Sequence, residues 1–338
     1  MTQTCQIFAG GDVTLQDGTL LRDARIAYTS YGELNAARDN AIVYPTFFCG
    51  THKENEWLIG ESRALDPRKY FIVVPNMLGN GLSTSPSNRP DYAGGKFPAV
   101  SIYDNVQLQY RLLTEHLNVA RVALAVGWSV GAQQAFHWGA LFPDFVERIA
   151  PICGSARTSR HNFVFLEGLK AALTADQAFN GGAYLEPPLQ GLKAVARVYA
   201  GWGFSQNFYR AECDLNDLGF PSLESFLVRF WEAFITHVDA NNFLAMLSTW
   251  QAADISCNDL YNGDFALALR SIKARAVVMP CRTDLYFPPE DSDIEVELMA
   301  SAELKIIPSI WGHSAGALGL NKIDVAFIDD AIKDLLNR

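Results

Sequence analysis

Cysteine is sparse in this chain. The 338 residues contain six cysteines, which are widely separated and form neither a CxxC pair nor a spacing typical of metal ligands. A chain of this length can bury a full core, so a disulfide framework is not expected. We expect reduced thiols in a cytoplasmic protein, with no metal and no organic cofactor. The six are Cys5, Cys49, Cys153, Cys213, Cys257 and Cys281.

Clusters of basic residues are also lacking. Lysine and arginine together number 27, against 37 aspartates and glutamates, and the formal net charge is −10. Binding to the phosphates of nucleic acid requires clustered positive side chains. We therefore expect no nucleic-acid partner, and we attribute the acidic balance to solubility.

No apolar run is long enough to suggest a membrane protein. The longest runs, such as residues 41–45 and 122–126, are far shorter than the roughly 20 residues of a membrane-spanning helix. The N-terminal sequence MTQTCQIFAGGDVTLQ has neither the charged nor the apolar region of a signal peptide. We expect no membrane partner and no signal peptide, and we interpret the apolar runs as buried strands.

Strand patterns that alternate with helix patterns make up most of what is present. The first 35 residues predict an antiparallel hairpin that turns at Asp17-Gly18. Beyond it, strands that alternate with helices predict a mostly parallel central sheet flanked by helices. The predicted strands are AIVYPTFF, KYFIVVPNM, RVALAV, RIAPICGS, ARAVVMPC and AELKIIPSI. The predicted helices of this layer are IYDNVQLQYRLLTEHL, AQQAFHWGALF and KIDVAFIDDAIKDLL.

The alternation breaks at about Ser159. Some 110 residues follow with helical periodicity and no convincing strand, including LKAALTADQAF, LQGLKAVARVYAGW and SFLVRFWEAFITHV. A helical insertion between two strands of one sheet is the simplest interpretation. We therefore predict a core domain of residues 1–158 and 272–338, with a helical lid at 159–271.

The nucleophile is predicted from a G-x-S-x-G motif at Gly127 to Gly131. The motif is a weak signal alone, but here a strand enters it and a helix leaves it, as a nucleophile elbow requires. The turn lifts the Ser129 hydroxyl above the sheet at a helix N-terminus, which favours developing negative charge. A second match, GHSAG at residues 312–316, contains Ser314. The chain order of such triads is Ser, acid, His, and Ser314 has no histidine downstream.

The general base must follow Ser129 in the sequence. His137 lies two turns into the helix after the elbow and is expected to point away from the nucleophile. His161 and His237 fall in the helical insertion, where an ordinary structural role is expected. His313 lies in a glycine-rich loop after the last predicted strand, so we predict His313 as the base.

The acid is expected just after the strand that resumes the sheet. VVMPCRTD ends at Asp284, where a carboxylate can accept the Nδ1 proton of His313. Asp291 and Asp293 are interpreted as charges at a helix N-terminus. Asp254 is the alternative acid.

The oxyanion hole requires two backbone N–H groups. The residue after the nucleophile, Val130, supplies one of them. The loop after AIVYPT supplies the other, for which we predict Phe48, with Phe47 as the alternative.

At this point the chain resembles the homoserine O-acetyltransferase family of α/β-hydrolases over nearly its whole length. The resemblance implies an α/β-hydrolase fold, an acyl-enzyme mechanism, a helical lid and frequent dimerisation through that lid. It rests on YTSYGELNAARDNAIV, KFPAVSIYDNVQLQYRLL, FNGGAYLEPPLQGLKAVARVYAGW, VDANNFLAMLSTWQAADIS, TDLYFPPED and WGHSAGAL.

The chain departs from that family at the residues that would hold homoserine, the molecule that accepts the acetyl group. Its transferases typically have HALTG where this chain has TFFCG, and GGSMGG where this chain has GWSVGA. The arginine that is thought to hold the homoserine carboxylate aligns with Lys170, which is a poorer bidentate partner. The acidic residue suited to hold the substrate amine is replaced by Ser314. Arg157, Arg160 or Arg197 could supply a different clamp.

An aromatic pocket is expected instead, lined by Phe47, Phe48, Trp128 and Trp311. Such a pocket suits an uncharged ester and resembles the branch of the family that hydrolyses small alkyl acetates. We predict a hydrolase for short-chain acetate esters of small alcohols, with Phe47, Trp128, Lys170 and Trp311 as substrate contacts.

Two other functions stay open. One is a homoserine or serine O-acetyltransferase that uses acetyl-CoA, and the other is a catalytically inactive binding module. A homodimer through lid helices is also expected, because SFLVRFWEAF carries dense aromatic side chains that a small lid would not bury alone. The alternative is that these aromatics only pack the lid onto the core. They are Phe226, Phe230, Trp231 and Phe234.

Overall fold

The computed structural model describes residues 4–93 and 95–338 of the chain. Within them an eight-stranded sheet has the order β1-β2-β4-β3-β5-β6-β9-β10. The first two strands form the predicted antiparallel hairpin, β2 pairs antiparallel with β4, and the remaining neighbours are parallel. The predicted mostly parallel sheet is confirmed. The strands are β1 (Gln6–Thr14), β2 (Leu20–Tyr31), β3 (Ala41–Val43), β4 (Phe71–Pro75), β5 (Val122–Trp128), β6 (Arg148–Ile152), β9 (Arg275–Val278) and β10 (Ala302–Leu304).

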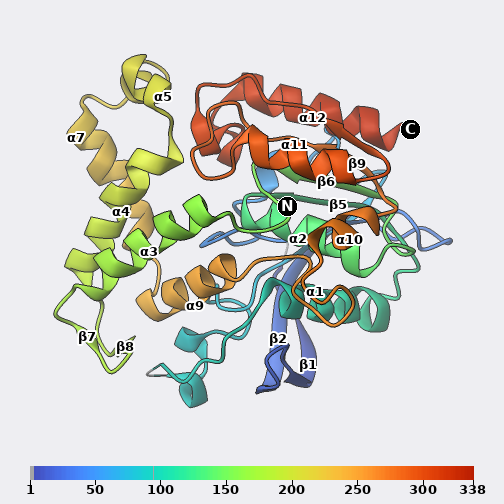
Figure 1. Cartoon of the computed structure of the whole chain (residues 1–338), viewed down its shortest axis with the longest axis horizontal. Coiled ribbons are helices and arrows are strands. Elements are labelled where there is room, and N and C mark those ends of the chain that lie inside the picture. Colours follow the sequence, from blue (N-terminus) through green and yellow to red (C-terminus); the bar gives the residue numbers. More distant parts are fainter. Residues whose placement is uncertain (1–3, 94) are drawn as a thin grey trace.

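Helices cover the sheet on both sides. Figure 1 shows β5, β6 and β9 between α12 (Lys322–Leu336) above and α1 (Ile102–Arg111) below. The helix α1 begins at a capping box, in which Ser101 and Asp104 satisfy each other's backbone N–H groups. The helix α11 (Pro289–Leu298) precedes β10.

The centre of the core is formed by β5 and α2 (Val130–Leu141). Every residue of both elements is buried. A helix that is buried on all faces carries apolar residues all round, which agrees with the low polarity of α2. Strand and helix meet at Ser129, so the predicted nucleophile lies at the junction of two fully buried elements.

Between β6 and β9 the chain is mainly helical. The strands β7 (Phe179–Asn180) and β8 (Ala183–Tyr184) form a short hairpin there. The expectation of no strand in this stretch was therefore wrong, because two-residue strands are too short to show a two-residue period. The helices are α3 (Arg160–Thr174), α4 (Leu189–Gly203), α5 (Gln206–Arg210), α6 (Cys213–Asn216), α7 (Leu223–Phe226), α8 (Ala233–Ile235), α9 (Ala240–Gln251) and α10 (Phe265–Arg270). Division into a core and a lid at residues 159 and 271 stays a prediction.

Aromatic side chains hold the helical stretch together. Phe204 packs against Phe208, Phe226 and Trp231, with ring centroids 4.1 to 5.7 Å apart. A π-helical turn at Leu227–Glu232 connects α7 to α8 and carries Trp231 inward. Phe226 and Trp231 are buried, whereas Phe234 stays 36% exposed. Much of the aromatic density of this segment is therefore used within the chain. Among the described residues, no helix is long and apolar enough to cross a membrane.

Candidate active site

Ser129 lies in the sharp turn between β5 and α2. Its backbone angles are φ +61° and ψ −128°, a conformation that few residues other than glycine adopt. Small neighbours permit it: a Cβ atom on Gly127 would lie 2.1 Å from the carbonyl oxygen of Gly131. A Cβ atom on Gly154 would lie 2.6 Å from the carbonyl oxygen of Ser129. The glycine pattern of the motif is thus a steric requirement of the elbow.

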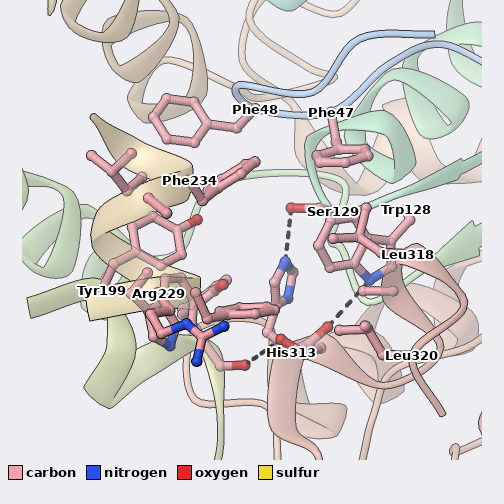
Figure 2. A pocket seen from close by; sticks show the side chains of 18 residues that line it. Phe47, Phe48, Trp128, Ser129, Tyr199, Arg229, Phe234, His313, Leu318 and Leu320 are labelled. Carbon is pink, nitrogen blue, oxygen red and sulfur yellow. Dashed lines mark hydrogen bonds between the residues drawn. The ribbon is translucent and has the colours of Figure 1, made fainter. Parts of the chain in front are cut away.

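The structure brings Ser129, His313 and Asp284 together in one chain of hydrogen bonds. The Nε2 atom of His313 lies 2.8 Å from the Oγ atom of Ser129 (Figure 2). Its Nδ1 atom lies 2.8 Å from Oδ2 of Asp284. The other carboxylate oxygen of Asp284 accepts the backbone N–H groups of Tyr286 and Phe287, each at 3.1 Å. With the Nδ1 proton donated to Asp284, Nε2 is free to accept the hydroxyl proton of Ser129.

Aromatic rings surround the His313 imidazole. Its centroid lies 4.3 Å from that of Tyr286, 4.6 Å from that of Trp128 and 5.6 Å from that of Phe287. The indole N–H of Trp128 also donates to the carbonyl oxygen of His313 at 3.2 Å. Burial strongly raises the pKa of Tyr286, so its phenol stays protonated near neutral pH. The imidazole is therefore held in one orientation in a largely water-free setting.

Three backbone N–H groups near Ser129 are available to a ligand within the described residues. Across the described residues, the N–H groups of Phe48 and Val130 donate to no protein acceptor. Val130 is the first residue of α2, where N–H groups lack helical partners. The N–H of Phe47 is likewise unpaired within this part of the chain. The choice of Phe48 over Phe47 stays a prediction.

A cavity of about 310 Å³ opens onto Ser129 and His313. Its walls are mainly apolar, and they come both from the core and from the helices between β6 and β9 (Figure 2). Within the described part of the chain, the lining contains no lysine, aspartate or glutamate, and its one arginine is Arg229, which is exposed. The apolar lining includes Phe47, Phe48, Trp128, Tyr199, Phe230, Trp231, Phe234, Leu318 and Leu320.

Two predicted substrate contacts lie elsewhere. Lys170 is on the exposed face of α3, where its Nζ atom lies 3.9 Å from Glu167. Trp311 is buried against Phe204 and Phe208, at 5.9 and 5.2 Å, rather than lining the cavity. The sequence gives the type of each residue but not the direction of its side chain, so neither position outside the cavity could be predicted from it. Phe47 and Trp128 do line the cavity.

The alternative clamp residues are also outside this cavity. Arg197 pairs with Glu224 and Glu232 at 2.6 and 2.8 Å. Arg157 and Arg160 line a separate hollow. Ser314 does reach the cavity, and its hydroxyl donates to the carbonyl oxygen of Gly203 at 3.0 Å.

The structure also places the alternative acid and the first downstream histidine. Asp254 accepts hydrogen bonds from the hydroxyl and the N–H of Ser256, whereas Asp284 is the carboxylate on His313. The Nδ1–H of His137 donates to the carbonyl oxygen of Gln133, one turn earlier in α2. Burial lowers the pKa of His137 to about 4, so this imidazole is neutral at pH 7.

Several residues that line the cavity were not predicted from the sequence. Tyr199 lies on α4, Phe234 on α8, Arg229 on the π-helical turn and Leu318 on a short turn after His313. None belongs to a motif with a fixed spacing from Ser129. Aromatic residues at helical spacing point equally to a core and to a cavity, so this sequence carried no signal that would have selected them.

Comparison with known proteins shows the family to which this chain is related. The alpha/beta hydrolase fold matches residues 48–316. An ethyl acetate hydrolase of Pseudomonas veronii is 40% identical over 323 residues, which cover 94% of this chain and 90% of that protein. A homoserine O-acetyltransferase of Trichormus variabilis is 31% identical, over 89% and 86% of the two chains. The solved structure of the acetyl esterase MekB matches with a TM-score of 0.95 and 38% identity, over 99% and 97% of the chains.

Proposed function

The chain belongs to the α/β-hydrolase family, and we propose from this premise that it hydrolyses acetate esters of small uncharged alcohols through an acyl-enzyme on Ser129. The observation that carries the proposal is the apolar cavity that ends on the hydrogen-bonded pair of Ser129 and His313. Relatives named as an ethyl acetate hydrolase and an acetyl esterase support the same substrate class.

The proposed reaction has two halves. In the first, Oγ of Ser129 attacks the ester carbonyl carbon, and Nε2 of His313 takes the hydroxyl proton and returns it to the leaving alcohol. In the second, water attacks the acyl carbon and His313 takes a proton from the water. His313 then returns that proton to Oγ of Ser129 as the bond to the acyl group breaks, which releases the carboxylic acid and restores the free serine. Asp284 stabilises the imidazolium in both halves, and the N–H groups of Phe48 and Val130 are proposed to bind the oxyanion.

The acceptor decides between hydrolysis and transfer. An alcohol competes with water for an acyl-enzyme only when the protein positions that alcohol. The residues considered for holding an amino acid do not converge here, because Lys170 lies on the surface of α3 and Arg197 is held by two glutamates. Water is therefore the proposed acceptor.

Acetyl transfer from acetyl-CoA to homoserine or serine is the second candidate. Arg229 favours it, because a guanidinium at the edge of the cavity can pair with a substrate carboxylate. The 31% identical homoserine O-acetyltransferase is consistent with this alternative.

A parallel assay separates the two candidates. Ethyl acetate and phenyl acetate in water are compared with acetyl-CoA plus homoserine, and acetyl-CoA plus serine, at equal enzyme concentration. The proposal predicts that ester hydrolysis is faster than either transfer reaction. A homoserine or serine acetylation rate above the hydrolysis rate would replace the hydrolase with the transferase.

We further propose a homodimer and a cytoplasmic location. Leu223 and Val228 leave half or nearly half of their surface exposed beside the buried aromatic cluster, which supports a partner at this face. In the described residues all six cysteines are free thiols, which is consistent with a reducing compartment.

A further inference from the structure

Beneath the candidate oxyanion loop lies a row of buried polar side chains. The indole Nε1–H of Trp138 donates to Oε1 of Gln109 at 3.1 Å, and Nε2 of Gln109 donates to Oε1 of Gln134 at 2.7 Å. Nε2 of Gln134 then donates to the carbonyl oxygen of Thr46 at 2.8 Å. The four residues have no exposed surface. The row therefore links α1 and α2 to the loop that follows β3.

The direction of these hydrogen bonds is fixed by its two ends. The indole N–H of Trp138 can only donate, and the carbonyl oxygen of Thr46 can only accept. Gln109 must therefore accept with its oxygen and donate with its nitrogen, and Gln134 must do the same. Only a side chain that accepts at one atom and donates at another can take the place of Gln134.

The Thr46 carbonyl belongs to the peptide group that carries the Phe47 N–H. In a trans peptide the C=O and N–H point in opposite directions, so a bond to one sets the direction of the other. Other contacts of Thr46 come from the neighbouring strand end: its N–H donates to Pro75 and its hydroxyl accepts the N–H of Met77. Gln134 thus orients this peptide from the side of the nucleophile helix.

Gln134 also shares a helix with the other half of the candidate oxyanion hole. It lies five residues after Ser129 on α2, whose first N–H belongs to Val130. The loop and helix are in close contact here, since a Cβ atom on Gly131 would lie 2.9 Å from the carbonyl oxygen of Pro45. The Gln134 side chain therefore connects the helix that carries the Val130 N–H to the loop that carries the Phe48 N–H.

We propose that Gln134 is a positioning residue, which holds the loop N–H donors at Phe47 and Phe48 in register with Val130 and Ser129. The inference rests on the proposed function, because it assumes that these N–H groups bind an oxyanion. A misplacement of about 1 Å can lower a rate about a hundredfold. Loss of the Gln134 bond should therefore slow acylation without removing the nucleophile.

The test compares Gln134→Met with the matched control Gln133→Met. Gln133 is the neighbouring, equally buried glutamine of α2, and its Nε2 donates to the hydroxyl of Thr158 rather than to the loop. Both variants lose a buried amide from the same helix. The rate of Ser129 phosphonylation by a fluorophosphonate is measured for each, because that reaction also requires the oxyanion site.

Gln134→Met should react at least about tenfold more slowly than Gln133→Met, and kcat for p-nitrophenyl acetate should fall by a similar factor with KM within about twofold. Equal phosphonylation rates in the two variants would overturn the positioning role. A wild-type protein that reacts with the probe but does not hydrolyse acetates would overturn the proposed function alone.

A third variant tests whether Gln134 acts through its hydrogen bonds or only through packing, because packing alone would not make the phosphonylation rate depend on pH. In Gln134→Glu only the protonated carboxyl can accept from Gln109 and donate to Thr46 together. Its phosphonylation rate relative to wild type should therefore rise as the pH falls, as the carboxyl becomes protonated. A ratio that stays low at every pH in a folded variant would contradict the proposal, whereas a ratio near one at every pH would show a carboxyl that burial keeps protonated and would agree with it.

Discussion

At the scale of single residues, Ser129 combines an unusual backbone conformation with a direct hydrogen bond to His313. Its φ of +61° turns the side chain out of the sheet, and the three glycines around it leave room for that turn. Ser314 has a similar sequence context, but its hydroxyl donates to a backbone carbonyl and has no histidine base. The motifs around Ser129 and Ser314 are therefore similar in sequence, but the two serines lie in different environments.

Replacing Ser129 by alanine should abolish turnover. Removal of a nucleophile of this kind lowers kcat by about 10⁴-fold or more, and the small side chain leaves the fold intact. The measurement is hydrolysis of p-nitrophenyl acetate, with circular dichroism to check folding. Ser314→Ala serves as the control and should keep substantial activity. An inactive Ser314→Ala beside an active Ser129→Ala would reverse the assignment.

Lys170→Ala should leave ester hydrolysis within about twofold of wild type, because an exposed pair with Glu167 contributes little and lies outside the cavity. Phe234→Ala is the comparison, since Phe234 lines the cavity and is already 36% exposed. Loss of its apolar contact should raise KM for phenyl acetate about fivefold. Steady-state kinetics with phenyl acetate gives kcat and KM for both variants. A large effect of Lys170→Ala on either constant would place this residue at the substrate.

At the scale of elements, α2 joins the nucleophile to the centre of the core. Its full burial means that its polar residues need partners inside the protein, and His137 finds one in the Gln133 carbonyl. The sequence predicted this helix as residues 132–142, because the elbow motif and the apolar pattern are local, and the structure begins it two residues earlier at Val130. It did not predict what the polar residues of the helix contact, since those partners come from segments far along the chain.

The buried His137 should make stability depend on pH. Burial lowers its pKa from 6.5 to about 4, so between these values the unfolded chain binds a proton that the folded protein does not. Stability is therefore lost as the pH falls from about 6.5 towards 4, by about 3 kcal/mol in total. Urea unfolding at pH 7 and pH 4.5 measures the loss.

His137→Gln provides the control for that measurement. This variant should lose about 2 to 3 kcal/mol less than wild type between the two pH values, because the other titrating groups remain in both proteins. An identical pH dependence in the two proteins would show that His137 titrates normally in the fold.

At the scale of the whole molecule, the core elements can be predicted from patterns of neighbouring residues, whereas the cavity depends on how distant segments pack. The strand predicted at residues 121–126, which the structure places at 122–128, and the order Ser129, Asp284, His313 follow from patterns that a single sequence displays. The cavity wall depends on how α4 and the π-helical turn fold back over Ser129, and a shift of two residues along a helix turns a side chain to another face. The sequence therefore did not show that Lys170 lies outside this cavity or that Arg229 lines it.

The proposed homodimer is testable by light scattering. At micromolar concentration the mass should be twice the chain mass of 37.3 kDa. Val228→Glu places a charge on the exposed apolar edge of the π-helical turn, so it should shift the protein towards the monomer. A wild-type mass of one chain across that concentration range would remove the dimer, and an unchanged dimer in Val228→Glu would move its interface elsewhere.

The central claim is that Ser129, activated by His313, is the residue that becomes acylated. The most direct measurement is reaction with a fluorophosphonate followed by peptide mass spectrometry of the adduct. The account predicts one adduct per chain, located on Ser129, and none in Ser129→Ala. An adduct on Ser314 or another residue, or no reaction of the folded wild-type protein, would contradict it.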